Sequence, residues 1–173
     1  IVIISSICSA HFSYLRQSMG RVRTASMLKR YLSPQIIETL DPEHLQLGGT
    51  KQEIAVLFTD VRGFTPITMT MESKKVVETI NSYLTVMTEK VFKFNGTLDK
   101  YTGDGLLAFW GAPVKDKDYK RNAFLCAVKI QKCCFELSCK RRKENKLVLD
   151  IGVGIASGQS VVGNIGSTQR MDY

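Results

Sequence analysis

The spacing of hydrophobic residues changes several times along the chain, and each change marks an expected element. Residues 54–59 form a β-rich run with apolar side chains on both faces, which predicts a central strand. Next, apolar residues three and four positions apart predict an amphipathic helix that buries Val76, Ile80, Tyr83, Leu84, Met87, Val91 and Phe94. Asn95-Gly96 is expected to end this helix.

The second half of the chain predicts a hairpin, a helix and two short strands. Residues 97–101 and 106–110 flank a Thr-Gly-Asp-Gly turn and predict the hairpin. A helix over residues 119–143 is expected to bury Phe124, Ala127, Ile130, Cys134 and Leu137. One strand is expected where Leu149, Ile151, Val153 and Ile155 alternate with smaller or polar residues, and the segment QSVVGNIG is expected to supply another. The order βαββαββ, with two helices on one sheet face, predicts an α+β sandwich of ferredoxin-like type.

The N-terminal third predicts a membrane segment and a connector. Residues 1–15 are apolar, carry His11 as their one ionisable group other than cysteine or tyrosine, and are followed by arginines. We interpret them as the end of a transmembrane helix with its basic flank in the cytoplasm. The alternatives are a buried N-terminal helix or part of a signal sequence. Residues 16–52 predict a helical connector that ends in a Gly-Gly hinge, and residues 53–173 predict the main domain.

Composition narrows the class of protein. A content of 44% hydrophobic residues with only four prolines predicts a folded chain. The net charge of +8 suits a nucleic acid, an anionic membrane or a polyphosphate. The basic cluster at residues 140–146 is interpreted as a solvated helix end, because cations are favoured beside a helix C-terminus. No stacking aromatic residues are interleaved with it, so nucleic-acid binding is a weak alternative. Five cysteines without a C-x-x-C pair and two histidines predict reduced thiols and no zinc site.

Two aspartates are the candidate functional residues. Asp60 ends the buried strand, and Asp104 lies between glycines at the hairpin tip. If these strands are neighbours, the carboxylates converge and repel unless a divalent cation holds both ionised. Oxygen ligands without nearby His or Cys favour Mg²⁺ or Mn²⁺, and the amides of residues 62–65 could form an anion nest for phosphate. The alternative is that each aspartate only caps a turn.

Three segments then carry a resemblance to a known family. FTDVRGFT, DKYTGDGLLAFWGAP and GNIGSTQRMDY occur in order between residue 53 and Tyr173. Together they resemble the class III adenylate/guanylate cyclase catalytic domain, in its bacterial membrane-anchored adenylate cyclase branch. The resemblance implies the ferredoxin-like α/β sandwich of that family, C-terminally incomplete because the family's last motif would follow Tyr173.

The resemblance also implies roles for individual residues. Two Mg²⁺ or Mn²⁺ ions per site would be held by the catalytic Asp60 and Asp104 and by the carbonyl of Val61. The substrate-binding positions would be Gly63, Phe64, Thr65, Lys100, Gly103 and Arg170. Lys100 would contact the purine, and an ammonium complements the unprotonated N1 of adenine, although guanine O6 is also an acceptor.

The implied function is an adenylate cyclase for signal transduction. ATP would be converted to 3′,5′-cyclic AMP and pyrophosphate by two-metal, in-line attack at a homodimer interface, on the cytoplasmic side of the cell membrane. The 173-residue chain alone is expected to be nearly inactive, since the family's ribose-positioning asparagine and arginine would follow it. Alternatives are a guanylate cyclase and a catalytically incompetent cyclase-like module that binds nucleotide or regulates a partner. Binding to nucleic acid is not expected.

Overall fold

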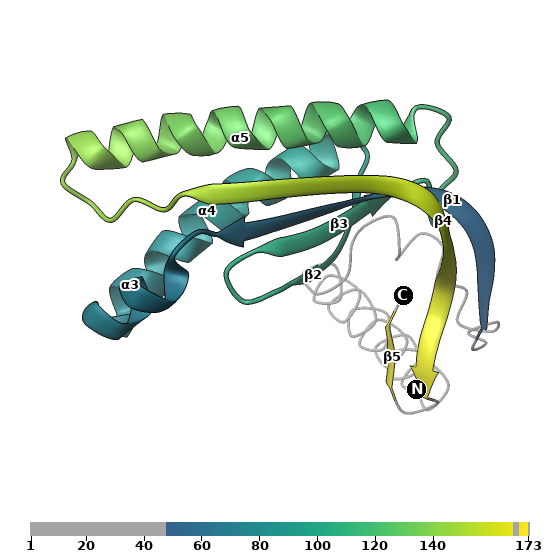
Figure 1. The fold of residues 1–173 in the computed structure, drawn as a ribbon, viewed down its shortest axis with the longest axis horizontal. Coiled ribbons are helices and arrows are strands. Elements are labelled where there is room, and N and C mark those ends of the chain that lie inside the picture. The colour runs from purple at the N-terminus through teal and green to yellow at the C-terminus, as the bar shows by residue number, and fades with distance from the viewer. Residues whose placement is uncertain (1–47, 168–169, 173) are drawn as a thin grey trace, which may run out of the picture.

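The protein folds around one antiparallel sheet with helices on one face (Figure 1). The computed structural model describes residues 48–167 and 170–172. The sheet order is β2-β3-β1-β4-β5, where the strands are β1 (Gly48–Val61), β2 (Thr97–Tyr101), β3 (Leu106–Trp110), β4 (Ile151–Ser167) and β5 (Arg170–Asp172). The helices are α3 (Phe64–Thr70), α4 (Ser73–Lys93) and α5 (Tyr119–Lys143). This confirms the predicted α+β sandwich and adds the short helix α3 to it.

The predicted membrane segment and most of the predicted connector lie outside the described residues. Within the described part, no helix combines the length and apolar composition that crossing a bilayer requires.

The hydrophobic core lies between the sheet and the helices α4 and α5. From the sheet, Leu57 and Trp110 are almost completely buried in it. Helix α4 contributes the predicted residues Val76, Tyr83, Leu84, Met87 and Val91. For α5, burial is confirmed at Ile130 and Cys134, and Ala127 and Leu137 are partly buried. The prediction was wrong at Phe124, which is 56% exposed, while the helix also buries Ala123, Cys126 and Ser138.

Two strand predictions are also corrected. Residues 48–50, expected to be a hinge, belong to β1 and pair with residues 162–164 of β4. The segment QSVVGNIG is the continuation of β4 rather than a separate strand, and Leu149 is buried just before β4 begins. Both strands are longer than predicted because they pair with each other from Gly48↔Asn164 to Val61↔Ile151. Each strand thus supplies hydrogen-bond partners for the backbone of the other.

The four described cysteines, Cys126, Cys133, Cys134 and Cys139, are free thiols, while Cys8 lies outside the described residues. Burial raises the pKa of Cys126 and of Cys134 to about 12. Both therefore stay protonated at neutral pH and act as small core residues.

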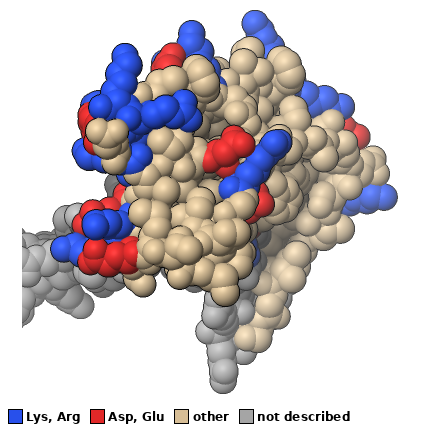
Figure 2. Space-filling view, turned by 60° about the vertical axis from the view of Figure 1, so that its left-hand side comes forward, with Lys and Arg blue, Asp and Glu red and all other residues tan. Residues whose placement is uncertain are grey.

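The basic end of α5 is partly structural. Lys140, Arg142 and Lys143 are exposed, as expected for a solvated helix end. Arg141 differs, because its guanidinium donates to the carbonyl of Leu147 at 2.6 Å and to Thr79 Oγ1 at 2.8 Å. On the face drawn in Figure 2, Lys and Arg side chains form separate groups with Asp and Glu among them, rather than one continuous band.

A buried polar network joins α4, α5 and the segment that leads into β4. The hydroxyl of Tyr83 lies 2.7 Å from Ser138 Oγ and accepts the Leu149 N–H at 3.2 Å. Ser138 Oγ in turn donates to the Leu149 carbonyl at 3.2 Å. Tyr83 is only 1% exposed, so water cannot replace these bonds.

We predict that Tyr83→Phe destabilises the protein by about 1–3 kcal/mol, because it leaves the buried Leu149 N–H without its acceptor. Urea denaturation followed by circular dichroism measures this. Tyr101→Phe is the control: its hydroxyl also meets a partner, Thr88 Oγ1 at 3.1 Å, but at an exposed position. Equal midpoints for wild type and Tyr83→Phe would contradict the assigned role.

Candidate metal and nucleotide site

Asp60 lies on the sheet face that points away from α4 and α5. Side chains alternate along a strand, and Ala55, Leu57 and Val61 belong to the helix-side core. Phe58 and Asp60 therefore belong to the opposite face, and both are exposed, Phe58 at 53%. In register, Asp60 faces Gly152 of β4, and the Arg62 side chain lies 3.6 Å from where a Cβ on Gly152 would be.

Asp104 lies in the turn between β2 and β3, which packs directly against the end of β1. The turn is closed by the Thr102 N–H, which donates to the Gly105 carbonyl at 3.0 Å, and Gly103 adopts a φ of 89°. A Cβ on Gly105 would overlap the carbonyl oxygen of Thr59. Asp104 precedes Gly105, and Asp60 follows Thr59. Strands β1 and β3 are neighbours in the sheet, as the sequence led us to expect, so the turn with Asp104 lies beside the end of β1 that carries Asp60.

The loop after Val61 differs from the expected anion nest. The Arg62 N–H donates to the Asp150 carbonyl at 2.8 Å and is not available to a phosphate. Gly63 adopts a left-handed φ of 64°, and α3 then begins at Phe64 without a side-chain cap. The nest is therefore reduced to the amides of Gly63, Phe64 and Thr65.

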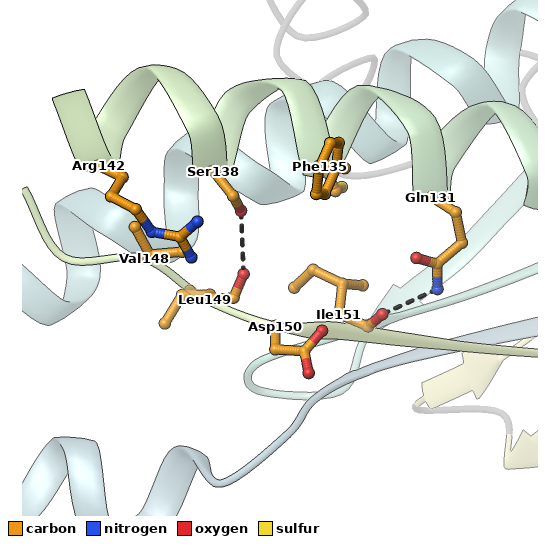
Figure 3. A pocket seen from close by; sticks show the side chains of 9 residues that line it. Gln131, Phe135, Ser138, Arg142, Val148, Leu149, Asp150 and Ile151 are labelled. Atoms are coloured by element: carbon orange, nitrogen blue, oxygen red, sulfur yellow. Dashed lines mark hydrogen bonds between the residues drawn. The ribbon is translucent and has the colours of Figure 1, made fainter.

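The segment that accepts the Arg62 N–H is itself anchored to α5 (Figure 3). Ser138 donates to the Leu149 carbonyl, and Gln131 donates to the Ile151 carbonyl at 2.8 Å. The carbonyl between them, that of Asp150, is the one that holds Arg62. These bonds border a cavity of about 320 Å³ between α5 and the start of β4, lined in part by Phe135 and Arg142 (Figure 3). They fix the backbone that follows Val61, the predicted carbonyl ligand.

Lys100 reaches the same sheet face as Asp60 because of a β-bulge. The pairing of β2 with β3 shifts between Leu98 and Lys100, so that Lys100 faces Leu107. Leu98 packs on the helix-side core, and the Tyr101 hydroxyl meets Thr88 of α4, so both flanking side chains belong to that side. Lys100, between them, belongs to the opposite side, and its ammonium lies 3.6 Å from the Asp99 carboxylate.

Arg170 is not brought to this end of the sheet. Its backbone pairs with Ser167, near the end of β4, whereas Asp60 faces Gly152 close to the start of that strand. At roughly 3.3 Å per residue, the two places lie at opposite ends of a long strand. Within one chain, the structure gathers Asp60, Val61, Gly63 and Asp104 and leaves Arg170 apart from them.

Sequence reasoning missed three residues that shape the site. Thr59 contacts the hairpin through its side chain and its carbonyl, Asp99 forms the bulge, and Asp150 anchors Arg62. The polar Thr59 within a buried run was the available signal for the first. Nothing in the sequence distinguishes Asp99 or Asp150 from ordinary strand and loop residues.

The donor set fits a hard divalent cation. Across residues 48–167 and 170–172, no group of three or more His, Cys, Asp and Glu gathers in a way that could hold a metal by itself. The available ligands are two carboxylates and backbone carbonyls, which are the oxygens that Mg²⁺ and Mn²⁺ take. Such a pair leaves coordination positions that water or phosphate oxygens can complete.

Comparison with known proteins gives consistent matches. The family described as "Adenylate and Guanylate cyclase catalytic domain" matches residues 48–173. Adenylate cyclase 1 of Rhizobium meliloti is 28% identical over 167 residues, 95% of this chain and 25% of that protein. An uncharacterized protein of Mycobacterium tuberculosis is 29% identical over 88% of this chain and 27% of its own length. The chain thus spans about a quarter of the curated relatives that it matches.

Solved structures agree with this. The guanylyl cyclase Cya2 is 35% identical, with a TM-score of 0.68, over 73% of this chain and 64% of that one. The adenylyl cyclase CyaB from P. aeruginosa is 32% identical, with a TM-score of 0.68, over 73% of this chain and 66% of that one.

We predict that Gly105→Ala destabilises the protein by more than the ~1–3 kcal/mol typical of overpacking, because the new Cβ meets rigid backbone at Thr59. Chemical denaturation measures the loss. Gly154→Ala in β4 is the matched control, since nothing lies within 4 Å of its added Cβ, and its midpoint is expected to stay the same or rise slightly. Equal behaviour of the two variants would contradict the close packing of the turn on β1.

Proposed function

Since the chain belongs to the family of adenylate and guanylate cyclase catalytic domains, we propose that its full-length protein is an adenylate cyclase. The proposed reaction converts ATP to 3′,5′-cyclic AMP and pyrophosphate by attack of the ribose 3′ oxygen on the α-phosphorus. The observation that supports the proposal is the packing of the Asp104 turn against the end of β1, because it brings the segment that carries Asp104 next to the segment that carries Asp60.

The roles of the chain's own residues follow from this geometry. Asp60 and Asp104, with the Val61 carbonyl, would hold two Mg²⁺ or Mn²⁺ ions, which when bound lower the pKa of the attacking hydroxyl and neutralise the phosphates. The amides of residues 63–65 would orient the triphosphate, and Gly103 would let the turn approach it closely. The work of the protein is then mostly positioning and charge neutralisation.

A homodimer is the proposed assembly. The sheet face that carries Asp60 also exposes Phe58, and Val56 and Leu107 beside it are only partly buried. Apolar side chains on a face that α4 and α5 do not cover suit a second copy of the chain. In such a head-to-tail pair, the aspartates of one subunit would act with Lys100 of the other, and a monomer would be inactive.

The choice of ATP over GTP depends on Lys100. The chain is 35% identical to a guanylyl cyclase and 32% identical to an adenylyl cyclase, so similarity does not separate the two substrates. An ammonium donates hydrogen bonds only and therefore complements N1 of adenine, whereas guanine carries an N–H there. Guanylate cyclase stays the second candidate, because guanine O6 could also accept from Lys100.

Cellular placement is part of the same proposal. The apolar residues 1–15 with their basic flank support anchoring at the cell membrane, with the catalytic domain in the cytoplasm. Signals would then reach the catalytic domain through the connector that precedes it.

We predict that Asp60→Asn in the full-length protein lowers Mn²⁺-dependent formation of cyclic AMP by at least about 100-fold, because a ligating carboxylate is lost. Product formation from ATP, quantified by chromatography, is the measurement. Glu136→Gln on α5 is the control, since it removes one negative charge at an exposed position on the helix layer. Wild-type turnover by Asp60→Asn would exclude the proposed metal site, and a wild-type protein without turnover would favour the regulatory module.

We predict that Lys100→Glu lowers kcat/KM for ATP by roughly 10- to 100-fold, the equivalent of one hydrogen bond to a charged group. Parallel assays with GTP should show a smaller loss or a gain, because a carboxylate accepts from the guanine N1–H. Lys93→Glu makes the same charge change in the last turn of α4 and is expected to leave the ATP to GTP ratio unaltered. An unchanged ratio in Lys100→Glu would remove Lys100 from base recognition.

A further inference from the structure

The backbone ladder between β1 and β3 stops before it reaches the two aspartates. Its last register pair is Phe58↔Leu107. In the next position, the Leu106 N–H donates to the side-chain hydroxyl of Thr59, Oγ1, at 2.9 Å instead of joining the ladder. Thr59 is 3% exposed and Leu106 is completely buried, so water cannot take over this bond.

This hydrogen bond joins the two segments that carry the carboxylates. Thr59 directly precedes Asp60, and Leu106 is two residues after Asp104. The Thr59 carbonyl also supports Gly105 from the same side. Asp60 is therefore the neighbour of Thr59 in the chain, and Asp104 is one residue from Gly105 and two from Leu106, the two residues that Thr59 contacts.

A threonine is well suited to this task. Its branched Cβ restricts χ1, so few positions are open to the hydroxyl oxygen. Two carboxylates without a cation repel each other, and that repulsion pushes their segments apart. A fixed oxygen that accepts a buried N–H opposes the separation without adding charge to the site.

We infer that Thr59 Oγ1 is a positioning group that sets the spacing of Asp60 and Asp104 and thereby the affinity of their divalent cations. Thr59 is not a ligand of the cation or of the nucleotide and acts through the backbone of the hairpin. The inference rests on the proposed function, because it presumes that the two aspartates bind metal.

The test is Thr59→Val in the full-length protein, since valine keeps the shape and removes the acceptor. We expect the Mn²⁺ concentration for half-maximal activity to rise about 10-fold, at the lower end of what loss of a supporting hydrogen bond costs a metal site. The second readout needs no turnover: the Mn²⁺-dependent shift in melting temperature in the presence of 3′-deoxy-ATP, which lacks the attacking hydroxyl, should move to higher Mn²⁺ by the same factor.

Two further variants separate positioning from general stability. Thr59→Ser keeps the hydroxyl, and its Mn²⁺ dependence should stay within about twofold of wild type, since the metal-site support is retained. Thr97→Val also removes a buried threonine hydroxyl from the sheet, one that donates to the Ala112 carbonyl at 3.0 Å, at the other end of the β2–β3 hairpin. It should lower the melting temperature and leave the Mn²⁺ dependence unchanged.

The outcomes are distinct. Wild-type Mn²⁺ dependence in Thr59→Val, or an equal shift in Thr97→Val, would overturn the inference and leave the proposed function standing. A wild-type protein with neither activity nor a Mn²⁺-dependent melting shift would overturn the proposed function itself. Should Thr59→Val not fold, Thr59→Ala and Thr59→Ser give the same comparison, because both lack the methyl group and only serine keeps the oxygen.

Discussion

The contact between the backbone of Gly105 and the carbonyl of Thr59 is the constraint on which the site depends. Strand β1 is central, with β3 on one side and β4 on the other, so its end is held in place by the sheet. A residue with a side chain at position 105 would force the hairpin away from that end. The absence of a single Cβ therefore decides how closely the turn that carries Asp104 approaches the end of β1, beside Asp60.

The β-bulge at Asp99 is a second constraint, and it decides toward which face of the sheet the Lys100 side chain points. In a regular strand, Leu98 and Lys100 would share a face, and burying Leu98 would turn Lys100 toward the helices. The bulge breaks this alternation, so Leu98 stays in the core while Lys100 joins the face of Asp60. A strand can thus serve the core and the site at once only by giving up regular pairing at one residue.

The sequence predicted the elements well where one physical pattern dominated. Helix α4 has one apolar face, and its buried apolar residues were identified correctly, although Ile80 and Phe94 are only partly buried and buried Thr79 was missed. Helix α5 carries exposed Phe124, Val128 and Phe135 as well as buried positions, so periodicity alone could not choose its inner face. The glycine-rich β4 shows weak strand propensity and is extended because β1 pairs with it along its length. For the site, residue types indicated the aspartates, whereas the bulge, the Arg62 bond and the role of Thr59 arise from pairing between distant segments.

The contacts that bring the two aspartates together involve no charged groups. Thr59, Gly105 and Leu106 hold the hairpin to β1 through a hydroxyl, a carbonyl and amide groups, and Asp150 holds Arg62 through its backbone. The energy that brings the segments of Asp60 and Asp104 together therefore comes from contacts of the buried sheet. This arrangement differs from small metal-dependent domains, where ion binding and folding are one event. If the protein acts as proposed, the fold would meet the cost of placing like charges near each other, and the free energy of cation binding would be available for orienting the nucleotide phosphates.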